Sequence, residues 1–340
     1  MRTMNERAVF DVLAAFGPVS SAGVAERTGI SKPTVSQALS SLARAGLVAT
    51  AGRTSGALGR IGWLYGVAGG GGYVVSLDIG IDVVRAAVGD LTGAIVSRVE
   101  RNVPTTTLRR LRHAVADAAS RVCVMAGITV GDLAGGVVGS PGAVDPRRPG
   151  LTHVGRLAYL DGVDLRSALS SQLGVPLEIE NDINLAAVGE HALGHSDPNM
   201  AVLSIGAGVG AALILDGRLR RGPRGAAGEV ESVPFRSGAS WQLAPLTGSS
   251  LHRYIAVRVG MLAAVADVEL VVLTGDLGLD RSVLGPVRRL VDAQVEDPPA
   301  IEVSSLGSSA VLLGGVALAH RATVDRLFAN LTSSRTERMA

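Results

Sequence analysis

From residue 74 onward, short apolar runs alternate with longer amphipathic segments, and this alternation limits the possible folds more than any other feature. Runs such as Val74–Leu77 and Ala201–Ile205 have the length and composition of buried strands. Segments such as Leu108–Ala126 and Gly248–Ala266 have the length and apolar spacing of helices. Alternation of this kind predicts helices packed on sheets. Because the pattern restarts at residue 201, we expect two α/β lobes with a cleft between them.

The individual elements follow from the same periodicities. The predicted strands are Val74–Leu77, Val84–Gly89, Ile95–Val99, Gly135–Gly139, Leu177–Glu180, Ala201–Ile205, Val209–Leu215 and Glu269–Thr274. The predicted helices are Leu108–Ala126, Leu165–Leu173, a helix that starts near Asn181, Gly248–Ala266, Arg281–Gln294 and Ser308–Ala329. The first three strands are expected to form an antiparallel meander.

Composition excludes several classes of protein. A chain of 340 residues with 47 % hydrophobic residues and 44 glycines can form two or three packed domains. The longest apolar run, Ala201–Leu215, is shorter than the roughly 20 residues that a bilayer-spanning helix needs. Cys123 is the only cysteine, so neither an internal disulfide nor a cysteine-rich zinc site is possible. We expect a soluble, cytoplasmic protein that needs no cofactor or metal.

Positive charge is concentrated at the N-terminus. Residues 1–63 contain seven Lys or Arg side chains and three acidic ones, whereas the rest of the chain has a slight acidic excess. Such a basic segment suggests a polyanionic partner.

The pattern of these residues predicts a helix-turn-helix. Val9, Leu13 and Phe16 recur at helical spacing, and a second helix is expected at Ala22–Thr28. Gly29 would form the turn, and Ser31 would cap the third helix. The inner face of that helix would carry Val35, Leu39 and Leu42, with Lys32, Thr34, Ser36, Gln37, Ser40 and Arg44 facing outward.

A wing is predicted after the third helix. Leu47–Thr50 and Ile61–Val67 have the composition of two strands, and the glycine-rich connection between them carries Arg53 and Arg60. We therefore expect a winged helix that reads operator DNA through its third helix and touches the backbone with the wing. The predicted DNA contacts are Ser31, Lys32, Thr34, Ser36, Gln37, Arg53 and Arg60. A small helical bundle with a solvated basic face is the alternative.

Several ordered motifs in the body resemble those of the ROK family of repressors and sugar kinases. They are GSPGAVD at 139–145, END at 180–182, the glycine-rich stretch at 204–231 and LVVLTGDLG at 270–278. The resemblance implies an actin-like, two-lobed body fused to the winged helix. The expected division is a winged helix at 1–67, a glycine linker at 68–73, a first lobe at 74–198 completed by helix 308–330, and a shortened second lobe at 199–307.

The sequence departs from the kinase pattern where phosphate would bind. The first phosphate hairpin of the family's kinases reads Asp-x-Gly-Gly-Thr, but Ile81 and Asp82 follow Asp78-Ile79-Gly80 here. The second hairpin, at 206–208, has Ala207 in place of a threonine, and no cysteine-rich zinc loop follows Ser232. Because a carboxylate near polyphosphate is repulsive, we expect no kinase activity.

The sugar side of the family pattern is better retained. The resemblance implies that Asn181, Asp182 and Glu229 bind sugar hydroxyls, with Asp182 at the position of the kinases' general base. Glu231 and Ser232 replace a glycine and a histidine of that pattern, which would alter the pocket or close it. The alternative for residues 180–182 is a purely structural helix cap, since Asn and Asp favour that position.

Three functions remain open from the sequence. The leading hypothesis is a DNA-binding transcriptional regulator, a repressor, that senses a sugar or sugar derivative and binds an inverted repeat as a homodimer or homotetramer. The alternatives are a carbohydrate kinase with a DNA-binding head and a DNA-binding scaffold that responds to no ligand.

Overall fold

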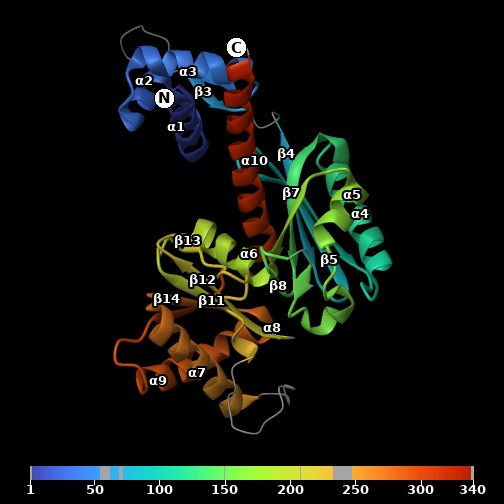
Figure 1. Ribbon diagram of the computed structural model, residues 1–340. Helices are drawn as coiled ribbons and strands as arrows, with labels where there is room; N and C mark the ends of the chain where they lie inside the picture. The colour runs from blue at the N-terminus through green and yellow to red at the C-terminus, as the bar shows by residue number, and fades with distance from the viewer. Residues whose placement is uncertain are drawn as a thin grey trace.

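The computed structural model describes residues 2–53, 62–68, 72–148, 150–206, 208–232 and 247–337, with the side chains of Arg156, Ser232 and residues 331–337 excepted. It contains a small N-terminal domain and two α/β lobes, and a long C-terminal helix runs from between the lobes to the N-terminal domain (Figure 1). The mixed α/β architecture predicted from the sequence is confirmed.

The N-terminal domain is a winged helix. Its elements are α1 (Arg2–Phe16), β1 (Val19–Ser20), α2 (Ser21–Thr28), α3 (Lys32–Arg44), β2 (Val48–Arg53) and β3 (Trp63–Val67). The strands form an antiparallel sheet in the order β1-β3-β2. Burial of Val35, Leu39 and Leu42 confirms the predicted inner face of α3.

Two details of this domain differ from the prediction. Phe16 is 62 % exposed, and Phe10, one helical turn and a half earlier, fills the core instead. Ser31 holds the N-cap position of α3, but its hydroxyl bonds the Thr34 hydroxyl at 2.9 Å rather than a backbone N–H. Arg60 and residues 69–71 of the predicted glycine linker lie outside the described residues.

The first lobe is a five-stranded sheet with helices on both faces. Its elements are β4 (Tyr73–Ile79), β5 (Val83–Asp90), β6 (Ile95–Asn102), α4 (Leu108–Met125), β7 (Leu133–Ser140), β8 (Ala143–Val144), β9 (Leu151–Thr152), α5 (Leu165–Leu173) and β10 (Leu177–Asn181). The sheet order is β10-β7-β4-β5-β6. The antiparallel pairing of β4 with β5 and of β5 with β6 confirms the predicted meander.

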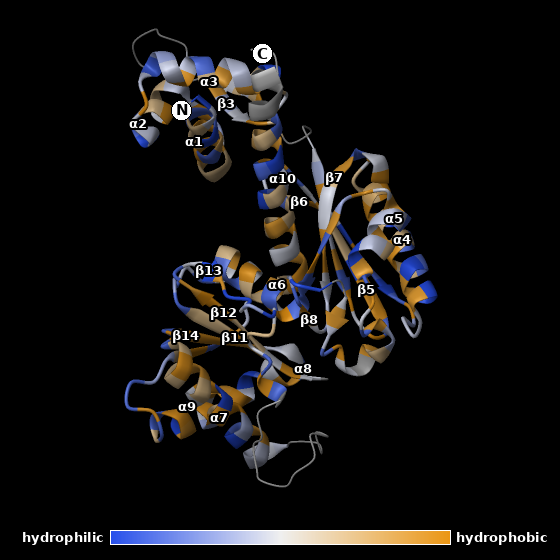
Figure 2. Cartoon of the chain, in the orientation of Figure 1, coloured by the Kyte–Doolittle hydropathy of each residue, from blue (hydrophilic) through white to orange (hydrophobic). Residues whose placement is uncertain are grey.

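The second lobe also contains a five-stranded sheet with helices packed on it. Its elements are β11 (Met200–Ile205), β12 (Val209–Leu215), β13 (Arg218–Leu219), α7 (Gly248–Ala266), β14 (Leu270–Thr274), α8 (Gly275–Gly278), α9 (Leu284–Asp292) and β15 (Ala300–Val303). The sheet order is β13-β12-β11-β14-β15. Apolar strands form the interior of both lobes, as Figure 2 shows.

Two helices, α6 (Asp182–Gly189) and α10 (Ala310–Glu337), lie between the sheets of the two lobes. A Cβ atom on Gly314 would lie 1.8 Å from the carbonyl oxygen of Leu185, and one on Gly189 would lie 2.4 Å from that of Ala310. The two backbones approach this closely because both contact positions are glycine. The helix pair therefore joins the lobes through contacts that leave no room for side chains.

The C-terminal half of α10 packs against the winged helix. Val324 and Phe328 belong to the same apolar cluster as the winged-helix core. The Phe328 ring meets the Phe10 ring edge-on at 5.6 Å, and Arg7 forms an ion pair with Asp325 at 2.5 Å. The winged helix is thus packed onto the helix that also runs between the lobes.

We predict that Gly314→Ala lowers the free energy of unfolding by about 2–3 kcal/mol, because the added methyl group must push α6 and α10 apart. Gly285→Ala is the matched control. Gly285 is exposed in α9, and the nearest atom to an added Cβ is 3.6 Å away. That control should be neutral or slightly stabilising, since alanine favours helix. Thermal and urea unfolding measure both effects, and equal stability of the two variants would contradict the packing described.

Candidate functional site

A cavity of about 390 Å³ lies between the two lobes. Its lining comes from the first lobe at Ile81 and Gly142, from the N-terminus of α6, and from the second lobe at the 206–211 hairpin and the 225–231 segment. Asn181, Asp182, Glu229 and Glu231 all line it, so the structure brings together four of the five residues that the sequence analysis proposed for a ligand. The side chain of the fifth, Ser232, is not described.

The start of α6 fixes one wall of the cavity. Asn181 is the N-cap residue: its Oδ1 accepts the N–H of Asn184, and its Nδ2 donates to the carbonyl of Gly142, both at 3.0 Å. The capping role considered as an alternative is therefore real for Asn181. The next side chain, that of Asp182, is not needed as a cap, and it lines the cavity.

Asp182 has an unusual electrostatic environment. Burial, together with the nearby carboxylates of Asp78 and Glu229, raises its pKa to about 7. The N–H of Ile183, which donates to Asp182 Oδ1 at 2.8 Å, opposes this shift only in part. A carboxyl group of this kind exchanges a proton near neutral pH.

Two glutamates reach the cavity from the second lobe. Burial and the neighbouring Glu231 raise the pKa of Glu229, while His153 opposes the shift. Glu231 Oε2 lies 3.4 Å from where a Cβ would stand on Gly208, so this carboxylate lies against the second glycine hairpin. His153 lines the same cavity with φ of 56°, a backbone conformation that is uncommon for a non-glycine residue.

The carboxylate of Asp78, in the first glycine hairpin, is paired with an arginine. Asp78 Oδ2 forms an ion pair with Arg85 Nη1 at 3.1 Å, and Arg85 Nε also pairs with Glu100 at 2.7 Å. Ile81 lines the cavity, whereas Asp82 is exposed and does not. The Asp82 carboxylate therefore does not face this cavity, and Ile81 is the hairpin residue that does.

One ion pair joins the two lobes beside the cavity. Arg221, after β13, donates through Nε to Glu180 Oε2 at 2.5 Å. Glu180 is buried and also accepts from Asn184 Nδ2 at 2.9 Å. Nothing in the sequence signals this pair, because its two residues are 41 positions apart.

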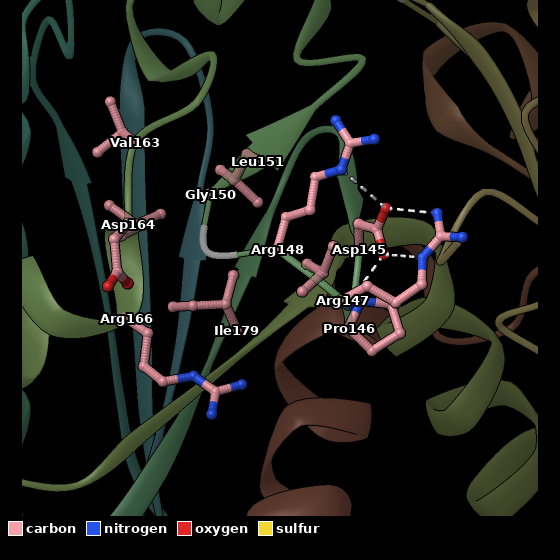
Figure 3. Close-up of a pocket in the computed structure, with 12 residues that line it drawn as sticks. Asp145, Pro146, Arg147, Arg148, Gly150, Leu151, Val163, Asp164, Arg166 and Ile179 are labelled. Carbon is pink, nitrogen blue, oxygen red and sulfur yellow. Dashed lines mark hydrogen bonds and ion pairs between the residues drawn. The ribbon is translucent and has the colours of Figure 1, made fainter. Parts of the chain in front are cut away.

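A second cavity, of about 320 Å³, lies in the first lobe (Figure 3). Three arginines surround it, but each has an acidic partner. Asp145 accepts Nε and Nη2 of Arg147 at 2.9 and 2.8 Å, which holds the pKa of this carboxyl well below its usual range. Arg148 lies 4.0 Å from the same carboxylate, and Arg166 pairs with Glu178 at 2.7 Å. With its charges balanced internally, this cavity is a weaker candidate than the one between the lobes.

The outer face of α3 forms a polar surface on the winged helix. Lys32, Ser36 and Gln37 are exposed, while Thr34 is half-buried. Ser36, Gln37, Ser40 and Arg44 line a shallow hollow together with Arg2 of α1. Arg2 was not among the predicted DNA contacts, because only the packing of α1 beside α3 brings it there.

The base of the wing carries an aromatic residue that the sequence analysis did not propose. Arg53 on β2 stacks over Trp63 on β3, with the guanidinium carbon 4.4 Å from the ring centroid. Trp63 is 48 % exposed. The cation–π contact with the Trp63 ring fixes the positive charge of Arg53 at the base of the wing.

Comparison with known proteins finds a family match for the body and another for the winged helix. Residues 74–236 match the ROK family, and residues 3–56 match the MarR family. The chain therefore carries a ROK family domain behind a winged helix of the MarR type.

Three relatives illustrate the range of similar proteins. The xylose repressor of Bacillus subtilis (strain 168) is 26 % identical over 232 residues, which cover 68 % of this chain and 60 % of the repressor. A ROK family transcriptional regulator, a homologue of the E. coli MLC protein, has a TM-score of 0.74 at 15 % identity over 96 % of this chain and 98 % of its own. The ROK hexokinase from Thermus thermophilus has a TM-score of 0.63 at 24 % identity over 74 % of this chain and 99 % of its own.

Among the described helices, none is both long and apolar enough to cross a bilayer. Within the same part of the chain, no group of three or more His, Cys, Asp and Glu side chains could hold a metal ion.

The raised pKa of Asp182 predicts how stability depends on pH. An unfolded aspartate titrates near pH 4, so between about pH 4 and 7 the folded protein retains a proton that the unfolded chain has lost. The free energy of unfolding should therefore fall as pH rises through this window. Asp182→Asn, which mimics the protonated form, should reduce the slope, leaving the contributions of Asp78 and Glu229.

Urea unfolding at several pH values measures this effect. Asp297→Asn, at an exposed loop position, is the control and should keep the slope of the native protein. If Asp182→Asn and the control give the same slope, the environment described for Asp182 is incorrect.

Proposed function

We propose that the protein is a sequence-specific DNA-binding transcriptional regulator, acting as a repressor, whose body senses a sugar or sugar derivative. The observation that carries the proposal is the connection of two surfaces by α10. At one end this helix packs against α6, whose first residue lines the interlobe cavity. At the other end it packs against the winged helix that presents Gln37 and Lys32.

Sugar sensing is supported by the cavity and by the relatives. Carboxylates bind vicinal hydroxyl groups through strong, charge-assisted hydrogen bonds. Asp182 and Glu229 are our proposed sugar ligands, with Glu231 and Ser232 altering the specificity. Asn181 contributes indirectly, because it caps α6 and so fixes the position of the N-terminus of that helix. Several similar proteins are named xylose repressors, but the chain spans only 60 % of the length of the Bacillus subtilis one, and the sugar itself stays open.

We propose that the body has no kinase activity. In a kinase the γ-phosphate needs donors and cations that neutralise its charge. Here Arg85 is already committed to Asp78 and Glu100, Ile81 adds an apolar side chain, and Glu231 sets a carboxylate against Gly208. Each of these features disfavours a bound polyphosphate.

The regulator is proposed to act as a homodimer or homotetramer. One winged helix offers a single recognition helix and therefore few base contacts. Two copies related by a two-fold axis would bind the halves of an inverted repeat and multiply the affinity.

DNA binding can be tested with duplexes selected from a random pool. The native protein should enrich one sequence, and its affinity should fall steeply with salt. Gln37→Ala should reduce discrimination against single-base changes by about 1–3 kcal/mol, because a base-edge contact is lost. Lys32→Ala should weaken binding and reduce its salt dependence, because it removes one positive charge from the same surface.

Arg98→Ala is the matched control, since Arg98 is exposed on β6 in the first lobe. It should leave both affinity and discrimination unchanged. A native protein that enriches no sequence, or Gln37 and Lys32 variants that behave like Arg98→Ala, would refute the proposed role of α3.

A further inference from the structure

The ion pair between Glu180 and Arg221 links the two lobes without lining the cavity between them. Glu180 lies near the end of β10 in the first lobe and is 5 % exposed, whereas Arg221 follows β13 in the second lobe and is exposed. Neither residue belongs to the lining of the interlobe cavity. Any effect of this pair on a ligand must therefore act through the residues to which it is attached.

On the first-lobe side, the Glu180 carboxylate is attached to the start of α6. Its Oε1 accepts the N–H of Asn181 at 3.0 Å and Nδ2 of Asn184 at 2.9 Å, and both of these residues line the cavity. Its Oε2 accepts from Arg221. Separation of the lobes at this point would take the cation away from a buried carboxylate, which is strongly unfavourable.

On the second-lobe side, Arg221 begins the segment that carries Glu229 into the cavity. The carbonyl of Arg221 accepts the N–H of Ala227 at 3.1 Å, so the two ends of this turn are bonded to each other. The carbonyl of Gly228 then accepts the N–H of Ala211 on β12 at 2.8 Å. Ala227, Gly228 and Glu229 all line the cavity. The position of Arg221 therefore helps to fix the position of this cavity wall.

The middle of the same segment also touches the first lobe. Gly225 has a φ of 71°, and a Cβ atom on it would lie 2.0 Å from the carbonyl oxygen of Val144. Only glycine allows the two backbones to approach this closely. Segment 221–229 thus meets the first lobe at a charged contact and at a backbone contact, and it remains bonded to β12 of its own lobe.

We infer that Arg221 is a positioning residue of the interlobe cavity, whose pair with Glu180 holds segment 221–229 and the start of α6 at a fixed separation. A ligand that is contacted from both lobes binds more tightly when the two walls are already held in place, because less ordering is needed on binding. The effect on a sugar rests on the proposed sensing function. The contact between the lobes can be tested without any ligand.

Amide hydrogen exchange on the full-length, ligand-free protein tests the contact. Arg221→Gln removes the charge from a half-exposed side chain and should still fold. Exchange should become at least about tenfold faster in two segments, 222–229 of the second lobe and 181–184 of the first. Exchange in β14 should match that of the native protein, which shows that the second lobe remains folded.

Arg220→Gln is the matched control. Arg220 is the neighbouring arginine, and it pairs with the exposed Asp216 of its own lobe at 2.8 Å. Its substitution should leave both segments unchanged, while Arg221→Lys, which keeps the charge, should restore most of the protection. Faster exchange confined to 222–229, or no change in either segment, would overturn the inference, because the pair would then not hold the lobes together.

Calorimetry with D-xylose, D-glucose and N-acetyl-D-glucosamine tests the effect on a ligand. For any of these sugars that binds the native protein, Arg221→Gln should weaken binding by about fivefold or more. Arg221→Lys should recover most of the affinity, and Arg220→Gln should match the native protein.

The contrary results of this titration are distinct. Equal affinity of the native protein and Arg221→Gln would overturn the positioning role and leave the sensing function in place. If none of the sugars binds the native protein, the sensing function and the effect on affinity both fail. The exchange comparison, which needs no sugar, then still decides whether the pair holds the lobes together.

Discussion

The backbone contact between α6 and α10 is the constraint on which the interlobe cavity and the position of the winged helix both depend. Gly314 against Leu185 and Gly189 against Ala310 leave no space for a side chain, so the two helices are held together. The pair is covered by apolar residues of both sheets, among them Val74 and Val202. A tightly packed interior has few intermediate arrangements, and a change in the angle between the lobes must be accommodated where this helix pair meets them. The N-terminus of α6, with Asp182, forms part of the cavity between the same lobes.

The other end of α10 packs against the winged helix, so the α6–α10 pair is connected to that domain. Burial of Val324 and Phe328 in the winged-helix core provides most of the attachment, because the exposed Arg7–Asp325 pair contributes little by itself. The winged helix therefore does not depend on residues 68–73 alone for its position. The coupling free energy between two sites is typically about 1–3 kcal/mol. A modest difference in the packing of α10 between two states is enough to supply it.

Local patterns in the sequence predicted most of the strands, though not β15, and the inner face of α3, and they gave the cap at Asn181 as an alternative, because each depends on neighbouring residues. The Glu180–Arg221 ion pair could not be predicted in this way, since its partners come from different lobes. The same holds for Phe10, which is buried against Phe328 of α10, whereas Phe16 is exposed, because a contact with α10 has no signal in the local periodicity. The exposure of Asp82 could not be predicted either, because the family pattern gives a position in the hairpin but not the direction of the side chain. His153 carries no sequence signal at all.

Amide hydrogen exchange, with and without a selected DNA duplex, tests most directly whether α10 couples the two surfaces. Coupling is reciprocal, so DNA bound at α3 must alter the body even when no sugar is present. We expect exchange rates to change in the winged helix, along α10 and at the start of α6. In Phe328→Ala, which removes the apolar contact of α10 with the winged-helix core, the changes in the body should shrink. Changes confined to residues 2–67 in the native protein would contradict the account.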